Sequence, residues 1–306
     1  MKLPVRQQTL LLCACILVSG WLTSGCTPED AAPQETGATR SLPGVFDCIR
    51  ERDTVMVSAH RAGPAPGLPE NAIEALDAVL DIGPAMIEVD VRTTGDGVMV
   101  LLHDRDLNRT TTGNGRISSK NYTQLERVRL KDPEGATTPY RIPTLHDALL
   151  ATKGRGILSL DLKAVETDRV VRLVEETDSM NWVSFVAYDL DDAIEIRRAA
   201  PDAMIALTIR SFRALDDARD ALGGLERVTA WTGTRDPNPR LYRALAESGV
   251  EVTLGTFGTA DRQEPATARR AYTQLKNQGV DIIASDRPRL VMSAIPPDKV
   301  AACMRI

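Results

Sequence analysis

From Thr54 onward, short apolar runs rich in β-branched residues alternate with segments of helical spacing. The runs occupy 54–60, 86–92, 98–103, 156–163, 182–188, 204–210, 228–233, 250–258 and 281–286. Segments with helical periodicity follow most of them, for example 71–83 after the first run and 169–178 after the fourth. Such alternation predicts parallel strand pairing and a layered α/β architecture.

The number of runs narrows this architecture further. Nine candidate strands are one too many for an eight-stranded barrel. The residues TTGDG at 93–97 indicate a turn, and 98–103 returns directly after it without an intervening helix. We therefore expect 98–103 to be an extra hairpin strand on a TIM-type (β/α)8 barrel. No G-x-G-x-x-G follows the first run, which disfavours an open dinucleotide-binding sheet.

The N-terminus has the pattern of an export signal. Lys2 and Arg6 precede a short apolar run that ends in LTSGC at Cys26. The run is too short to predict a membrane span. Its end resembles a bacterial lipoprotein signal, in which the cysteine becomes the lipidated first residue, although Leu22 stands one place further back than that pattern prefers. The alternative is an ordinary signal peptide in which Cys26 has no role.

These features predict four parts of the chain: a lipoprotein-like signal peptide (1–25), a linker (26–50), the barrel (51–295, with an insertion at about 104–143) and a C-terminal tail (296–306). Residues 27–41 are rich in Pro, Ala, Thr and acidic residues without periodicity, which is typical of a linker. The long irregular insertion is expected to be a lid or specificity element. We expect the protein to be exported to the cell envelope and lipid-anchored in the periplasm or at the cell surface.

Charge and cysteine content limit the partners and the redox compartment. The formal charge is -5, and without residues 1–25 it is -7, from 35 basic and 42 acidic side chains. A mildly acidic chain without basic clusters argues against a nucleic-acid partner. Cys48 and Cys303 lie near the two ends of the folded region. They are either a disulfide, as an oxidising compartment would allow, or two buried thiols.

Charged residues gather where the predicted strands end. Glu88 and Asp90 are two residues apart, so one strand would point both to the same face. Folding back at the 93–97 turn would place His103 roughly opposite Glu88. The run 54–60 ends in His60 and is followed by Arg61.

Two further strands add to this set. The run 156–163 carries Asp161 and Lys163, and the last run ends in Asp286. Active sites of such barrels lie at the carboxyl ends of the strands. Three carboxylates converging there require a cation, and oxygen ligands suit one Mg²⁺ or Ca²⁺. With two histidines, Arg61 and Lys163 nearby, the set is typical of a site for a phosphate ester.

The same residues resemble a known family. SAHRAGPAPGLPENAIEAL (58–76) and MIEVDVRTTGDGVMVLLHDRDLNRTTTGNGRI (86–117) are similar to the glycerophosphodiester phosphodiesterase signature. That signature reads HRG, PENT, IExD, TxDG, then HD followed by RTT and Gly. The resemblance continues through LSLDLK and IIASDRP, so that it covers residues 54–290.

The resemblance implies roles for the residues at matching positions. His60 and His103 would be the general acid and base, and Glu70 would orient Arg61 or approach the metal. The metal ligands would be Glu88, Asp90 and Asp161, and the phosphate contacts would be Arg61 and Lys163. The reaction would release glycerol phosphate and an alcohol, by attack of the substrate's own glycerol hydroxyl through a cyclic phosphate or by direct attack of water.

Several positions depart from the pattern. Ala62 replaces glycine in HRG, Ala72 replaces threonine in PENT, and Asp161 replaces a glutamate. Gly255-Thr256 replaces a Trp-Thr pair, which would remove an aromatic wall for the alcohol group. These changes leave open a phospholipase D-like enzyme on lysolipids or sphingolipids, or an idle barrel that binds a phosphorylated ligand.

Simpler structural roles are also open for several residues. Lys163 could merely pair with Asp161, and Asp286 could cap a loop. His146 is expected at the surface near a helix start, and Trp182 and Trp231 in the core.

Overall fold

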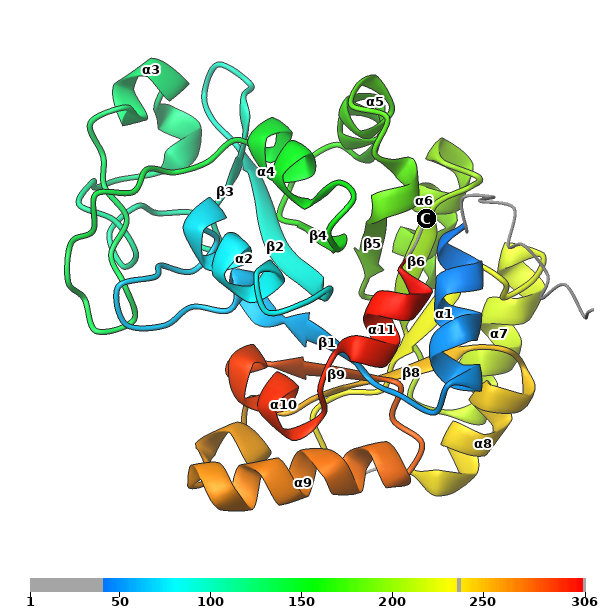
Figure 1. Ribbon diagram of the computed structural model, residues 1–306. Coiled ribbons are helices and arrows are strands. Elements are labelled where there is room, and N and C mark those ends of the chain that lie inside the picture. Colours follow the sequence, from blue (N-terminus) through cyan, green and yellow to red (C-terminus); the bar gives the residue numbers. More distant parts are fainter. Residues whose placement is uncertain (1–40, 236–237, 305–306) are drawn as a thin grey trace, which may run out of the picture. The chain divides into compact units, whose positions relative to one another are not determined.

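The computed structural model describes residues 41–235 and 238–304 (Figure 1). The expectations for a signal peptide at 1–25 and for lipidation at Cys26 therefore concern residues outside these ranges. Within them, no helix is both long and apolar enough to cross a membrane.

Eight parallel strands close into a barrel, which confirms the predicted architecture. Each strand is hydrogen-bonded to the next around the ring, and β1 joins both β9 and β2 to close it. The strands are β1 (Met56–Ala59), β2 (Met86–Thr93), β4 (Ile157–Leu162), β5 (Val183–Ala187), β6 (Met204–Thr208), β7 (Val228–Trp231), β8 (Glu251–Gly255) and β9 (Ile282–Ser285). Their carboxyl ends therefore form one rim.

Strand β3 (Met99–Leu101) is the predicted extra hairpin strand. It pairs antiparallel with β2 and lies outside the ring. The expected pairing of Glu88 with His103 is wrong, because the ladder aligns Val91 with Leu101 and Thr93 with Met99. The strand ends before His103.

Helices follow most of the barrel strands (Figure 1). They are α2 (Ile73–Leu80), α4 (Leu145–Thr152), α5 (Thr167–Glu176), α6 (Leu190–Ala199), α7 (Phe212–Leu222), α8 (Pro239–Glu247), α9 (Pro265–Asn277) and α10 (Pro288–Ala294). The main core lies among these helices and the strands. The insertion is largely irregular, with a 3₁₀ turn at Ile117–Ser119 and one short α-helix, α3 (Tyr122–Leu125).

Two short helices replace parts of the predicted linker and tail. Helix α1 (Leu42–Glu51) overlaps the second half of the predicted linker and its boundary with the barrel, and α11 (Asp298–Cys303) lies within the predicted tail. Figure 1 shows them side by side, and a disulfide between Cys48 and Cys303 joins them. This bond decides between the two alternatives for the cysteines.

Both helices help to close the amino-terminal end of the barrel. Their buried residues form a second core cluster with the first residues of several strands, namely Met56, Met86, Ile157, Met204 and Ile282. Trp182 packs against this cluster, as predicted. In the sequence, α1 is indicated by Pro43 at a helix start and by the helical spacing of Val45, Phe46 and Ile49 after it.

Candidate active site

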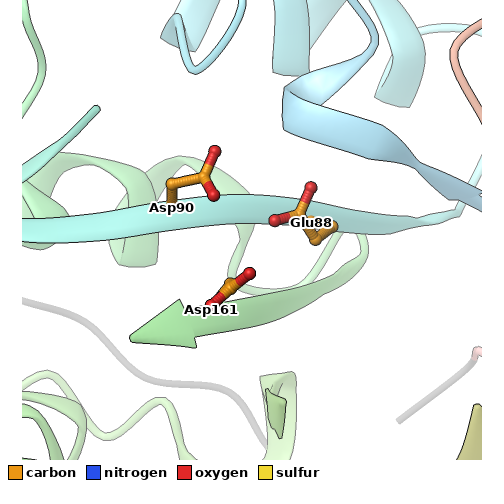
Figure 2. Close-up of side chains that lie close together, drawn as sticks. All are labelled: Glu88, Asp90 and Asp161. Atoms are coloured by element: carbon orange, nitrogen blue, oxygen red, sulfur yellow. The ribbon is translucent and has the colours of Figure 1, made fainter. Parts of the chain in front are cut away.

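Three carboxylates meet on the barrel wall. Figure 2 shows Glu88 and Asp90 on β2 and Asp161 on the neighbouring β4, and one oxygen of each lies within 4.8 Å of the others. The parallel register aligns Asp90 with Asp161, and Glu88 precedes Asp90 by two residues on the same face. Because β3 lies outside the ring, β2 and β4 become neighbours and bring the acids together.

The donor set fits a cation. Asp161 Oδ1 is buried and has no hydrogen-bond partner among the described residues. Burial, followed by the charge of Asp90, raises the pKa of Glu88 to about 8. A cation would relieve both effects, since hard oxygen ligands and shared negative charge are what Mg²⁺ and Ca²⁺ bind. The three carboxylates could therefore hold one metal ion.

Asn71, which the sequence interpretation missed, fixes one of these acids. Its side-chain amide donates to Asp90 Oδ2 at 2.8 Å, and the Asp90 N–H donates to Asn71 Oδ1 at 2.9 Å. Asn71 is buried and has a left-handed backbone (φ 59°), a conformation that asparagine tolerates well. Its position in the PEN motif is the signal that could have identified it.

His60 points toward the acids from the end of β1. Its Nε2 lies 4.0 Å from Glu88 Oε2, and its Nδ1 lies 2.7 Å from Asp286 Oδ1. Its ring stacks on Phe257 with the centroids 4.3 Å apart. Burial alone would lower the pKa of His60, but the Asp286 hydrogen bond and the Glu88 charge raise it overall. Asp286 thus contacts His60, instead of only capping a loop.

A left-handed turn holds the next residues. Arg61, Ala62 and Gly63 all have positive φ (49°, 66° and 69°), so the position of the family's glycine is left-handed here and is occupied by alanine. The turn directs the Arg61 N–H to Glu88 Oε2 at 2.7 Å. The Arg61 guanidinium lies 3.5 Å from Glu70 Oε1 and 3.8 Å from Asp90 Oδ2.

Lys163 lies against the carboxylates from the end of β4. Its Nζ is 2.5 Å from Asp161 Oδ2 and 3.5 Å from Asp90 Oδ1. It also donates to the Tyr188 hydroxyl at 2.9 Å, and that hydroxyl donates to Asp161. Burial would lower the pKa of Lys163, but its bonds to Asp161 and Tyr188 raise it overall. Tyr188 is thus a further residue at the site that the sequence interpretation did not identify.

The other two histidines lie in different surroundings. His103 is partly exposed, and its Nδ1 lies 2.7 Å from Asp104 Oδ1. Its carbonyl accepts from the Arg92 guanidinium at 2.8 Å, which ties the residue to the β2 edge. His146 is exposed in the first turn of α4, as predicted. Among the described residues, His60 is the one histidine with a ring nitrogen within 4.0 Å of an oxygen of these three carboxylates.

A cavity of about 220 Å³ opens beside the site, and His60, Glu88 and Asp161 are among the residues that line it. Trp231 and Phe257 form an aromatic wall, with near-parallel rings 6.1 Å apart. Two expectations were therefore wrong, since an aromatic wall is present and Trp231 lines the cavity. The glycine in place of tryptophan explains this, because a Cβ at Gly255 would lie 2.6 Å from the Trp231 ring.

Known proteins share this chain's sequence and fold. Human "Glycerophosphodiester phosphodiesterase 1" is 27% identical over 170 residues, which are 53% of this chain and 51% of that protein. The match thus spans about half the length of that relative. A glycerophosphoryl diester phosphodiesterase structure from Parabacteroides distasonis is 34% identical with a TM-score of 0.76, and the match covers 82% of this chain and 93% of that one.

A more distant structure has the same fold. A phosphodiesterase from Oleispira antarctica, solved with its product sn-glycerol-3-phosphate, is 22% identical with a TM-score of 0.62, over 80% of this chain and 98% of that chain. The model of the Glycerophosphoryl diester phosphodiesterase family matches residues 60–290. This match covers most of the chain and includes His60, the carboxylates and Asp286, so the chain belongs to the glycerophosphoryl diester phosphodiesterase family.

Proposed function

We propose that this protein hydrolyses glycerophosphodiesters to glycerol phosphate and an alcohol in a metal-dependent reaction. The observation that carries the proposal is the cluster of Glu88, Asp90 and Asp161 with His60 Nε2 beside it. The family match and the cavity next to this cluster support the same reaction.

In this proposal, Glu88, Asp90 and Asp161 hold one divalent cation, Mg²⁺ or Ca²⁺. Such an ion would supply Lewis-acid polarisation of a phosphoryl oxygen when bound. Arg61 and Lys163, both already at the carboxylates, would contact the remaining phosphate oxygens.

His60 and His103 would exchange the protons. One would remove the proton of the attacking hydroxyl, from water or from the substrate's glycerol, while the other protonates the departing alcohol oxygen as its bond to phosphorus breaks. An aspartate at Nδ1 of each ring leaves both Nε2 atoms for this work. Glu70, 3.5 Å from Arg61, would orient that guanidinium.

A release assay tests the proposal directly. Purified protein would be incubated with a panel of glycerophosphodiesters and lysolipids in Mg²⁺, Ca²⁺ or chelator. We expect His60→Ala and His103→Ala each to lose about 10²-fold or more of kcat. His146→Ala, at the exposed third histidine, is the control and should match the wild type. Full turnover in both of the first two variants would refute the roles assigned here.

We also propose that the protein is exported and lipid-anchored through Cys26. The leader pattern before Cys26 supports this, as does the Cys48–Cys303 disulfide, because such bonds persist in oxidising compartments. Cell fractionation should find the protein in the membrane fraction and Cys26→Ala in the soluble exported fraction. Wild-type protein in the cytoplasm would contradict the proposal.

A further inference from the structure

The side chain of Arg109, in the insertion that follows β3, contacts two carboxylates at once. Nε and Nη2 donate to Asp104 at 2.7 and 3.0 Å. Nη1 and Nη2 donate to the two oxygens of Glu70 at 2.8 and 2.9 Å. One planar guanidinium thus makes two bidentate contacts, which fix direction as well as charge.

Each of the two carboxylates contacts a residue of the proposed machinery. Asp104 Oδ1 accepts from Arg109 and also lies 2.7 Å from His103 Nδ1. Glu70 Oε1 accepts from Arg109 and also from the Arg61 guanidinium, at 3.5 Å. Arg109 is therefore the junction of a chain of contacts that runs from His103 to Arg61.

These contacts join two separate loops. Glu70 belongs to the loop between β1 and α2, while Asp104 and Arg109 belong to the insertion. Without a cation between them, the two carboxylates would repel and could turn away from their partners. His103 would then lose the acceptor that holds its Nδ1, and Arg61 would lose a contact that orients it.

We infer that Arg109 is a positioning residue that holds Asp104 against His103 and Glu70 against Arg61. It links the proton-transfer part of the site to the phosphate-binding part and makes the insertion part of the site. Arg109 itself need not touch the substrate. The kinetic side of this inference rests on the proposed function, whereas the state of the His103 ring can be measured without a substrate.

Replacing Arg109 with glutamine should reduce kcat/KM by roughly 10- to 100-fold, as expected for a residue that orients a catalytic group. We expect kcat to fall because His103 is no longer held in place, and KM to rise because Arg61 is no longer oriented toward the phosphate. Arg109→Lys should recover little, because an ammonium cannot hold two carboxylates in one plane. Arg127→Gln, an exposed arginine of the same insertion, should behave as the wild type.

Double variants separate positioning from general stability. In an Asp104→Asn background, Arg109→Gln should change only KM, and in a Glu70→Gln background it should change only kcat. If Arg109→Gln instead changes kcat and KM in both backgrounds by the same factors as in the wild type, the inference is overturned.

The second readout is the ¹⁵N NMR signal of His103 in substrate-free protein. We expect the proton on Nδ1 in the wild type and a mixture of tautomers in Arg109→Gln and Arg109→Lys. An unchanged tautomer in both variants would refute the inference. If the wild type turns over no substrate but the two variants still differ from it in the His103 tautomer, only the proposed function is refuted.

Discussion

His60 Nδ1 lies 2.7 Å from Asp286 Oδ1, although 226 positions separate the two residues in the chain. Barrel closure explains the contact. Strands β1 and β9 are parallel neighbours that align Ala59 with Ser285, so the residues that follow each strand meet at the rim. The hydrogen bond leaves His60 Nε2 facing the carboxylates.

Asp286→Asn should lower kcat by roughly 10- to 100-fold while the fold is retained. An asparagine can present its N–H to Nδ1, which favours the tautomer with the proton on Nε2. Steady-state kinetics would measure the loss, with circular dichroism as the check on folding. Asp220→Asn, at an exposed position of α7, is the control. Equal kcat in the two variants would mean that Asp286 does not orient His60.

Cation binding should stabilise the fold through Asp161. A ligand bound only by the folded state adds about 2.7 kcal/mol when its concentration is a hundred times Kd. We therefore expect Mg²⁺ or Ca²⁺ to raise the melting temperature of the wild type and of Asp191→Asn, an exposed control. Asp161→Asn should show little shift. Thermal unfolding with and without the ion measures this, and an equal shift in all three proteins would exclude the carboxylate cluster as the binding site.

The architecture could be predicted because it depends on features that repeat along the chain. Strand and helix periodicity identified the eight parallel barrel strands, and the turn before Val98 identified the extra strand. Register could not be predicted from the turn alone, so His103 was placed opposite Glu88. Helix α1 was missed because its short amphipathic pattern follows a long segment without periodicity.

The same distinction holds for the site. Glu88 and Asp90 were predictable because they share one strand face, and His60 and Asp161 because they lie at or near the ends of predicted strands. The contacts His60–Asp286 and Arg109–Glu70 depend on which strands and loops become neighbours, which no local pattern states. Gly255 leaves room for the Trp231 ring, because a Cβ at position 255 would lie 2.6 Å from it. This relation between the two residues is likewise visible only in three dimensions.

A buried carboxyl at the opposite end of the barrel should make stability depend on pH. Glu251 is 3% exposed, and its side-chain Oε1 accepts a hydrogen bond from the Arg50 guanidinium of α1. Burial nevertheless raises its pKa from 4.5 to about 8, with Arg50 opposing the shift and Asp281 adding to it. The folded state therefore binds a proton that the unfolded state has lost between these pH values. Stability should fall as pH rises through this window, by at most about 1.4 kcal/mol per pH unit.

Glu251→Gln replaces this titrating carboxyl with a neutral amide and should make the pH dependence between about pH 5 and 8 less steep. The part that remains comes from Glu88, whose pKa is also raised to about 8. Urea unfolding at several pH values would measure the free energy of unfolding of each variant. The control is Glu247→Gln, at an exposed position near the end of α8, which should keep the wild-type slope. If Glu251→Gln follows the same curve as that control, then Glu251 is ionised in the folded protein throughout the range.

The left-handed turn after His60 should tolerate a substitution at position 62 but not at position 63. Ala62→Gly removes about 1–2 kcal/mol of left-handed strain but also a buried methyl group worth about 0.8 kcal/mol, so stability should change by about 1 kcal/mol or less. Gly63→Ala adds strain at φ 69°, and its Cβ would lie 2.6 Å from Pro288 and 2.9 Å from Val79.

We expect Gly63→Ala to lower the free energy of unfolding, measured with urea, by more than about 2 kcal/mol. It should also lower kcat, because the turn holds both the His60 ring and the Arg61 N–H that donates to Glu88. Ala62→Gly is the matched control, since it changes the same turn without adding an atom. Similar stability and activity in the two variants would show that the turn can shift without disturbing the site, and that its left-handed conformation does not hold His60 in place.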